Sequence, residues 1–186
     1  MTRLAFETEP RDEPRLGLIV LQSDETIENE FRRLLPPAAT LHVSRVPSGR
    51  EVTPATLSVM ENHIGQSANL LPEPTRFDVV GYACTSGTAV IGAAKVAELV
   101  RSGTSAGAVT DPVSALVAAC RHLGVSKLAF LSPYVEAVST RIRAVLEEQA
   151  VETPVFGSFG TSEEALVARI APASTVRAAE ELAADP

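Results

Sequence analysis

Hydrophobic and polar positions follow two patterns along the chain: short apolar runs, and longer stretches with helical periodicity. The short runs predict strands over residues 16–21, 40–46, 77–83, 106–110, 127–131 and 153–159. The longer stretches predict helices over residues 25–35, 53–70, 90–101, 112–123 and 135–149, and a last helix that Ser174 caps. Strands that alternate with helices of this length favour an α/β fold with mainly parallel sheets.

One part of the pattern is repeated. Residues 18–35 resemble residues 128–146, and in both an apolar strand is followed by an amphipathic helix with paired arginines. Any two strand–helix units look somewhat alike, so chance similarity is the alternative. A true repeat predicts two pseudo-symmetric, flavodoxin-like lobes. We expect a tail over residues 1–15, an N-terminal lobe over residues 16–104 and a C-terminal lobe over residues 105–186.

Composition excludes several classes of protein. The net charge of −7 and the absence of a basic cluster argue against a nucleic-acid partner. No apolar run approaches the about 18 residues of a membrane span, and the N-terminus has no signal-peptide pattern. Two cysteines make no disulfide framework, and the spacing of the three histidines fits no metal site. We therefore expect a cytoplasmic protein with neither a metal nor an organic cofactor.

Cys84 is the strongest candidate for chemistry. It ends the apolar run over residues 77–83 and is followed by Thr85, Ser86, Gly87 and Thr88, after which a helical pattern begins. The carboxyl end of a parallel strand is where ligands bind in open α/β sheets. The N-terminus of the next helix favours a thiolate and can hold a carboxylate. The alternative is a buried structural cysteine.

The second cysteine has a different setting. Cys120 lies on one helical face with Val113, Leu116 and Val117, which favours core packing over chemistry.

Several motifs in the same order resemble the Asp/Glu racemase superfamily, specifically its maleate isomerase-like branch. They are GLIV at 17–20, VVGYACTSG at 79–87, SPYV at 132–135 and GSFG at 157–160. Within that branch, residues 18–28 are most similar to ectoine-utilisation proteins. The resemblance implies two lobes with a small acid between them, one cysteine per lobe, and homo-oligomers. The second cysteine of the family would follow Pro186, so we expect a truncated chain, an incomplete second lobe and no activity from these 186 residues alone.

The resemblance also assigns site residues. Cys84 matches the N-lobe cysteine, and Tyr134 matches a tyrosine that reaches a substrate carboxylate. Thr85, Ser86 and Gly87 would supply donors to that carboxylate. Asp24 and, in a looser alignment, Glu164 stand where maleate isomerases have asparagine. An ionised carboxylate only accepts hydrogen bonds, so these acids favour a substrate with an ammonium group over a second carboxylate. The alternative for Asp24 is a helix cap.

The expected function is a cofactor-independent racemase or isomerase of a small carboxylic or amino acid, and the similarity to ectoine-utilisation proteins implies a role in ectoine catabolism. A thiolate can abstract the proton next to a carboxylate, or add to a double bond and leave after rotation. The alternatives are decarboxylation of a malonate-type acid, which needs a single thiol, and non-catalytic binding of a small acid.

Overall fold

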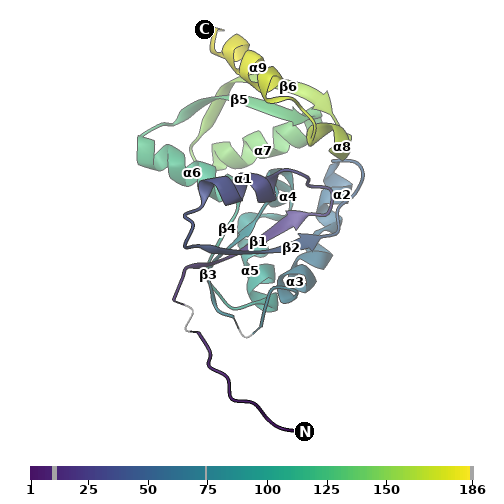
Figure 1. Cartoon of the computed structure of the whole chain (residues 1–186). Coiled ribbons are helices and arrows are strands. Elements are labelled where there is room, and N and C mark those ends of the chain that lie inside the picture. Colours follow the sequence, from purple (N-terminus) through teal and green to yellow (C-terminus); the bar gives the residue numbers. More distant parts are fainter. Residues whose placement is uncertain (10–11, 74, 185–186) are drawn as a thin grey trace.

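The computed structural model describes residues 1–9, 12–73 and 75–184 and shows two α/β lobes stacked on each other (Figure 1). The first lobe contains β1 (Arg15–Leu21), α1 (Ile27–Leu34), β2 (Thr40–Val46), α2 (Pro54–Val59), α3 (Glu61–Asn69), β3 (Phe77–Tyr82), α4 (Thr85–Ile91), α5 (Ala93–Gly103) and β4 (Ala106–Thr110). The second lobe contains α6 (Pro112–Leu123), β5 (Lys127–Tyr134), α7 (Glu136–Glu148), β6 (Glu152–Thr161), α8 (Glu164–Val167) and α9 (Pro172–Ala184). The predicted α/β fold with parallel sheets is confirmed.

The first sheet has the strand order β2-β1-β3-β4, and all its pairs are parallel. Its central strands carry the apolar residues that sequence periodicity singled out, and Leu18, Ile19 and Val20 are buried. Helices α3 and α5 pack side by side on one face of the sheet (Figure 1). After β1 the chain turns to one side of the sheet, and after β3 it turns to the other. The carboxyl ends of these neighbouring strands therefore border a crevice, the usual ligand position in this architecture.

One predicted boundary is wrong. The division at residues 104/105 places the fourth strand in the second lobe, but β4 pairs with β3 in the first sheet, with Phe77 opposite Ala106 and Gly81 opposite Thr110. The apolar pattern predicted the strand itself correctly. It carried no information about which sheet the strand joins, because periodicity reports burial and not pairing.

The second lobe has a two-stranded parallel sheet, β5–β6, with α7 on one side and α9 on the other (Figure 1). Thus β1–α1–β2 and β5–α7–β6 are both strand–helix–strand units with parallel strands, as the repeat predicts. Two details differ from prediction. Strand β5 continues to Tyr134, and α9 begins at Pro172, so that Ser174 lies inside the helix and does not cap it.

The helix after Cys84 also differs from prediction. It begins directly at Thr85 and not near Val90, because the small polar residues form its first turn. Gly92, with φ of 95°, then separates α4 from α5, a backbone conformation that residues with a side chain rarely adopt. Cys84 is consequently the residue that caps α4.

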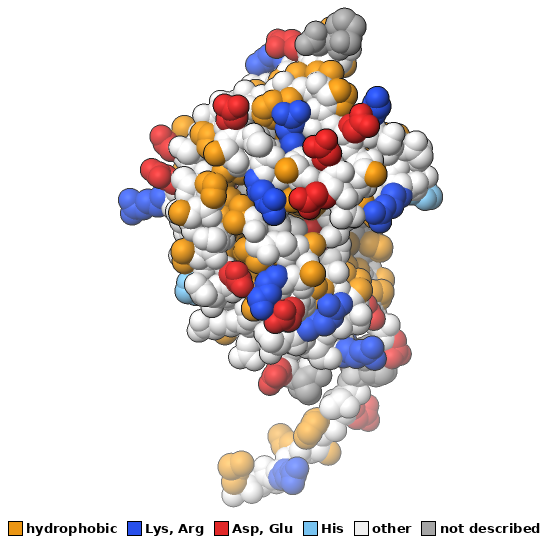
Figure 2. All heavy atoms as spheres, turned by 180° about the vertical axis from the view of Figure 1, so that it is seen from behind, with side chains coloured by type: hydrophobic (Ala, Val, Ile, Leu, Met, Phe, Trp, Pro, Cys, Tyr) orange, Lys and Arg blue, Asp and Glu red, His pale blue; other side chains and the backbone are white. Residues whose placement is uncertain are grey.

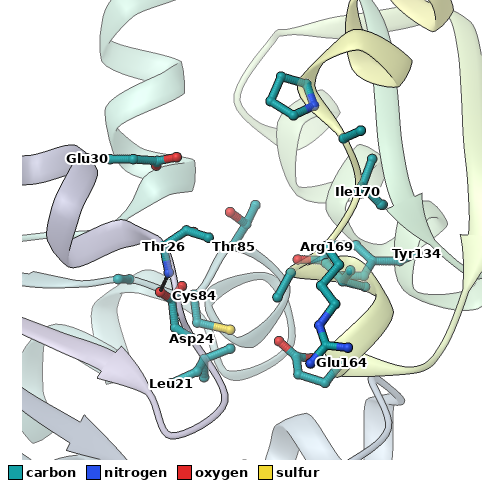
Figure 3. A pocket seen from close by; sticks show the side chains of 15 residues that line it. Leu21, Asp24, Thr26, Glu30, Cys84, Thr85, Tyr134, Glu164, Arg169 and Ile170 are labelled. Atoms are coloured by element: carbon teal, nitrogen blue, oxygen red, sulfur yellow. Dashed lines mark hydrogen bonds between the residues drawn. The ribbon is translucent and has the colours of Figure 1, made fainter.

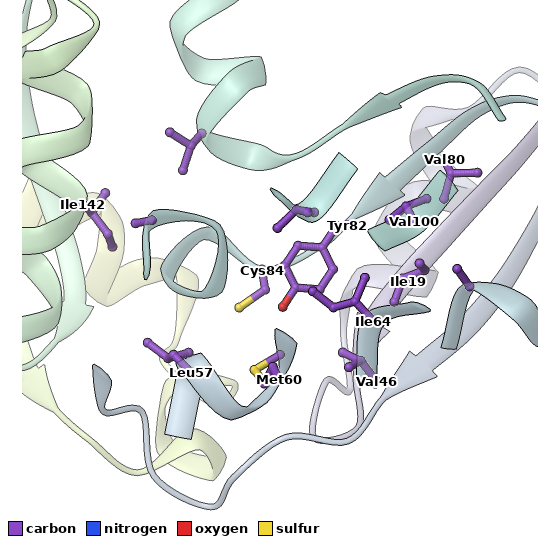
Figure 4. Packing of buried hydrophobic residues seen from close by; sticks show 14 of the residues in the cluster. Ile19, Val46, Leu57, Met60, Ile64, Val80, Tyr82, Cys84, Val100 and Ile142 are labelled. Atoms are coloured by element: carbon purple, nitrogen blue, oxygen red, sulfur yellow. The ribbon is translucent and has the colours of Figure 1, made fainter. Parts of the chain in front are cut away.

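The two lobes are joined by backbone and core contacts. The amide of Val52 donates to the carbonyl of Ser162, and the amide of Glu164 donates to the carbonyl of Arg50. Residues from both lobes belong to one hydrophobic cluster, in which Ile142 of α7 faces the elements around Cys84 (Figure 4). The second lobe is thereby held over the carboxyl ends of β1 and β3.

One face of the molecule is mixed in charge (Figure 2). On the face shown in Figure 2, acidic and basic side chains alternate and no basic patch forms. Within the described ranges, no helix has the length and apolar character needed to cross a bilayer.

Candidate active site

A cleft of about 490 Å³ lies between the lobes at the carboxyl ends of β1 and β3. Figure 3 shows the labelled side chains that converge on it from both lobes. The first lobe contributes Leu21, Asp24, Thr26, Glu30, Ala83, Cys84 and Thr85. The second lobe contributes Tyr134, Glu164 and the connection from α8 into α9, residues 167–172. Of the predicted site residues, the structure brings five together here: Asp24, Cys84, Thr85, Tyr134 and Glu164.

Cys84 lies at the N-terminus of α4. Its sulfur accepts a hydrogen bond from the amide of Gly87 at 3.1 Å, and the Ser86 hydroxyl lies 3.6 Å away. The Thr88 hydroxyl donates to the Cys84 carbonyl, so it is occupied and unavailable to a substrate. Only 4% of the Cys84 residue surface is exposed, at the wall of the cleft.

Burial decides the ionisation of this thiol. The pKa of Cys84 is raised, first by loss of solvent and further by the charge of Glu164. The hydrogen bonds with Ser86 and Gly87, and to a smaller extent the nearby Tyr82 hydroxyl, oppose the shift without cancelling it. The expected preference for thiolate at the helix N-terminus is therefore outweighed by desolvation, and the free protein holds a neutral thiol near pH 7.

Two of the predicted substrate-binding residues lie beneath the sulfur. Ser86 and Gly87 are buried and do not line the cleft. They contact Cys84 through the Ser86 hydroxyl and the Gly87 amide. Their positions favour support of the thiol over contact with a substrate, whereas Thr85 faces the cleft. The sequence placed all three in one turn but could not show which way each points.

Tyr134 enters the cleft from the end of β5, where buried serines fix its backbone. The Ser139 hydroxyl lies within hydrogen-bond distance of the Ser132 hydroxyl, at 2.9 Å, and of the Tyr134 carbonyl, at 3.1 Å. The Ser132 hydroxyl accepts from the Tyr134 amide. Burial, with the nearby Cys84 and Glu164, raises the pKa of the Tyr134 phenol, and a hydrogen bond with Ser86 opposes this. The phenol is therefore a neutral donor.

Two carboxyl groups face each other across the cleft. One oxygen of Asp24 accepts from the amides of Thr26 and Ile27, both at 2.9 Å, so Asp24 supports the start of α1, whose N-cap residue is Thr26. Glu164 lies on α8 opposite, and its carboxyl points toward the same space as the Cys84 sulfur (Figure 3). Burial raises the pKa of Glu164, and the charge of Asp24 adds to this, while a hydrogen bond from Ser23 opposes it.

Arg169 and Glu30 also line the cleft, and sequence reasoning missed both. Arg169 follows α8 and lies 3.9 Å from Glu25 of the first lobe in a largely exposed ion pair, which contributes little to stability. Its guanidinium is a natural partner for a carboxylate. No local motif marks it, because its place depends on how the α8–α9 connection folds over the first lobe.

Cys120 lies elsewhere. It is buried in α6 with Val113 and Val117, as its helical spacing predicts. Across the described residues, no three His, Cys, Asp or Glu side chains are grouped so that they could hold a metal ion.

Comparisons with known proteins relate the chain to maleate isomerases. No protein-family model matches the chain. It is 27% identical over 153 residues to a maleate isomerase of Geobacillus stearothermophilus, covering 74% of this chain and 60% of that protein. It is 30% identical over 150 residues to a maleate isomerase of Nocardia farcinica, covering 73% of this chain and 57% of that protein. The chain thus spans about 60% of the length of these relatives.

Solved structures show the same fold. The maleate isomerase Iso of Pseudomonas putida S16 superposes with a TM-score of 0.75 at 24% identity, over 90% of this chain and 73% of that one. A second solved structure is a cysteine-to-serine mutant of the Nocardia farcinica maleate cis-trans isomerase with a covalently bound succinylcysteine intermediate. It superposes with a TM-score of 0.74 at 26% identity, over 90% of this chain and 72% of that one. A liganded mutant of arylmalonate decarboxylase superposes with a TM-score of 0.69 at 26% identity, over 92% of this chain and 74% of that one. The comparisons support a place for the chain in the Asp/Glu racemase-like superfamily, alongside maleate isomerases and arylmalonate decarboxylase. The similarity to ectoine-utilisation proteins is not tested by them.

Proposed function

We propose that this chain belongs to a cofactor-independent isomerase or racemase of small carboxylic acids, with Cys84 as the reacting thiol. The observation that carries the proposal is the place of Cys84. Its sulfur borders the cleft between the lobes, at the carboxyl end of β3 and the N-terminus of α4. The succinylcysteine in the Nocardia relative supports covalent chemistry at a cysteine of this fold.

The chemistry follows from what surrounds the sulfur. In the addition route, the thiol loses its proton, the sulfur bonds to one carbon of a double bond, and the electron pair passes to the other carbon beside a carboxylate. Rotation about the new single bond and loss of the thiolate restore the double bond in the other geometry. In the proton-transfer route, the thiolate removes the proton next to the carboxylate, and a second acid returns one to the opposite face. The family resemblance gives that role to a further cysteine, which is not the core residue Cys120.

Charged groups in the cleft favour an amino-bearing acid. Arg169 can bind one carboxylate, together with the Thr85 hydroxyl and the Tyr134 phenol. Asp24, Glu30 and Glu164 provide negative charge for an ammonium group. An amino acid or an acylated diamino acid satisfies both, and such a substrate would suit a role in ectoine catabolism. Maleate, with two carboxylates, satisfies only the first.

Decarboxylation of a malonate-type acid is the second candidate. The observation that favours it is the raised pKa of Cys84, because a neutral thiol is ready to donate a proton to the carbanion that loss of CO₂ leaves. The similarity of the fold to arylmalonate decarboxylase agrees with it.

Competition between ligand and alkylating reagent tests the proposal. Iodoacetamide should modify Cys84 before Cys120, because Cys84 borders the cleft whereas Cys120 is packed in α6, and mass spectrometry of the peptides reads both sites. An amino acid or an N-acetylated diamino acid should slow the modification of Cys84 more than maleate or a malonate does. Cys120 serves as the internal control. Preferential modification of Cys120, or equal rates with and without every acid, would remove the site assignment.

Turnover is read separately on the same mixtures. Proton NMR in D₂O detects isomerisation, exchange of the proton next to the carboxylate, or loss of CO₂, and Cys84→Ala should abolish whichever occurs. Protection of Cys84 without any of these reactions would agree with the inactivity expected of these 186 residues and would argue against the single-thiol routes of addition and decarboxylation in this chain.

A further inference from the structure

The hydroxyl of Tyr82 is a buried polar group next to the site that makes no hydrogen bond with the described residues. The Tyr82 side chain is fully buried, and its hydroxyl is the one buried side-chain oxygen or nitrogen without a hydrogen-bond partner in the described part of the chain. A buried hydroxyl without a partner is costly, because it gives up water and gains nothing in exchange. Phenylalanine would fill the same space without this cost, so packing alone does not account for a tyrosine here.

The hydroxyl lies beside the sulfur of Cys84. Figure 4 shows it pointing toward the Cys84 side chain from the end of β3. Gly87 gives an independent measure of their closeness. A Cβ atom at Gly87 would lie 2.8 Å from the Tyr82 oxygen and 2.9 Å from the Cys84 sulfur, so both atoms border one small space that this glycine keeps open.

We propose that Tyr82 is a positioning residue for Cys84, whose hydroxyl is a hydrogen-bond donor reserved for the ionised sulfur. The neutral thiol already accepts from the Gly87 amide. When the thiol releases its proton to solvent or substrate, the negative sulfur can accept further bonds, and the Tyr82 hydroxyl, which borders the same small space, is a donor without another partner among the described residues. A donor that is used only by the charged form favours that form selectively. The inference rests on the proposed function only in requiring that Cys84 ionises.

Tyr82→Phe tests this in the full chain. The pH profile of iodoacetamide modification at Cys84 should move upward by about one pH unit, the worth of a hydrogen bond to a charged group. At a fixed pH below the midpoint the rate should fall only about threefold, because a more basic thiolate is a better nucleophile. The urea midpoint should stay the same or rise, since the variant loses a buried hydroxyl that had no partner. An unchanged pH profile of Cys84 modification in folded Tyr82→Phe protein would overturn the inference.

A second variant keeps the test open if Tyr82→Phe does not fold. The chain has two tyrosines, so growth of Tyr134→Phe protein with 3-fluorotyrosine changes Tyr82 alone. Fluorine makes the phenol a stronger donor, and the midpoint of the Cys84 profile should then move downward relative to Tyr134→Phe protein with ordinary tyrosine. A midpoint that stays in place contradicts the inference.

Both measurements read the thiol without a substrate. If no small acid binds the cleft, the proposed function fails while the role of Tyr82 is still tested. If acids bind but the two profiles do not move, the role of Tyr82 fails and the proposed function stands.

Discussion

Asp24 is a residue with two roles. One oxygen of its carboxyl group accepts hydrogen bonds from the amides of Thr26 and Ile27 at the start of α1, which is a structural role. The side chain also borders the cleft, where its charge faces any ligand. Asparagine separates the roles, because it caps helices about as well as aspartate but carries no charge. Asp24 can therefore support the helix and repel or attract a ligand at the same time, and substitution by asparagine measures its effect on the ligand.

We expect Asp24→Asn to change ligand preference more than stability. Loss of the charge near the helix N-terminus should cost a few tenths to about 1 kcal/mol. Binding of maleate-like diacids should improve, and binding of amino-bearing acids should weaken, each by about tenfold for charges several ångströms apart in a half-buried cleft. Calorimetric titration with both ligand types measures this. A stability change with an unaltered preference would leave Asp24 as a cap alone.

At the scale of elements, the β5–α7 junction positions Tyr134. Two buried hydroxyls, of Ser132 and Ser139, bind each other and the Tyr134 backbone, so the end of β5 is fixed before the phenol enters the cleft. This pair had no sequence signal beyond two serines in a strand–helix unit. Its effect depends on the irregular pairing of β5 between Ser132 and Tyr134, which periodicity does not reveal.

We expect Ser139→Ala to loosen Tyr134. The Ser132 hydroxyl and the Tyr134 carbonyl each lose a neighbour in a buried place, and the free energy of unfolding should fall by about 1–3 kcal/mol. The chain has no tryptophan, so in a Tyr82→Phe background the tyrosine fluorescence reports Tyr134 alone. Acrylamide should quench it more strongly in Ser139→Ala protein. Ser58→Ala, at an exposed serine of α2, is the matched control, and equal quenching in both would remove the positioning role.

The positions of most strands and helices could be predicted from the sequence. Period-2 and period-3.6 patterns predicted the strands and most helices, and the end of an apolar run placed Cys84 correctly at the border of a cleft. The patterns could not assign β4 to the first sheet, because pairing depends on long-range contacts. They also missed α8 and Arg169, whose position depends on the path of one connection across the other lobe. Tyr82 looked like a core residue, and only the structure shows its hydroxyl next to the sulfur.

At the scale of the whole molecule, the cleft brings together two acids from different lobes. Glu164 of α8 and Asp24 after β1 repel each other when both are ionised, and this repulsion opposes the contact between the lobes. The backbone bonds between residues 50–52 and 162–164 hold the lobes together against it. An ammonium group between the two acids would relieve the repulsion, which connects the proposed substrate to the packing of the lobes.

This arrangement makes stability depend on pH in a definite direction. The folded protein raises the pKa of Glu164 above its unfolded value of about 4.3, mainly by burial, so folding favours the protonated carboxyl. Well below the unfolded pKa, Glu164 is protonated in both states, and Glu164→Gln should match the wild-type chain there. As pH rises through the folded pKa, the wild type should lose stability relative to the variant, so that Glu164→Gln is the more stable protein at pH 7. Urea midpoints from pH 4 to 8 measure this, with Glu163→Gln at the exposed neighbouring position as the control. If Glu164→Gln is instead the less stable protein at pH 7, the carboxylate is held by a favourable partner such as Arg169, and the repulsion between the lobes is not the dominant effect.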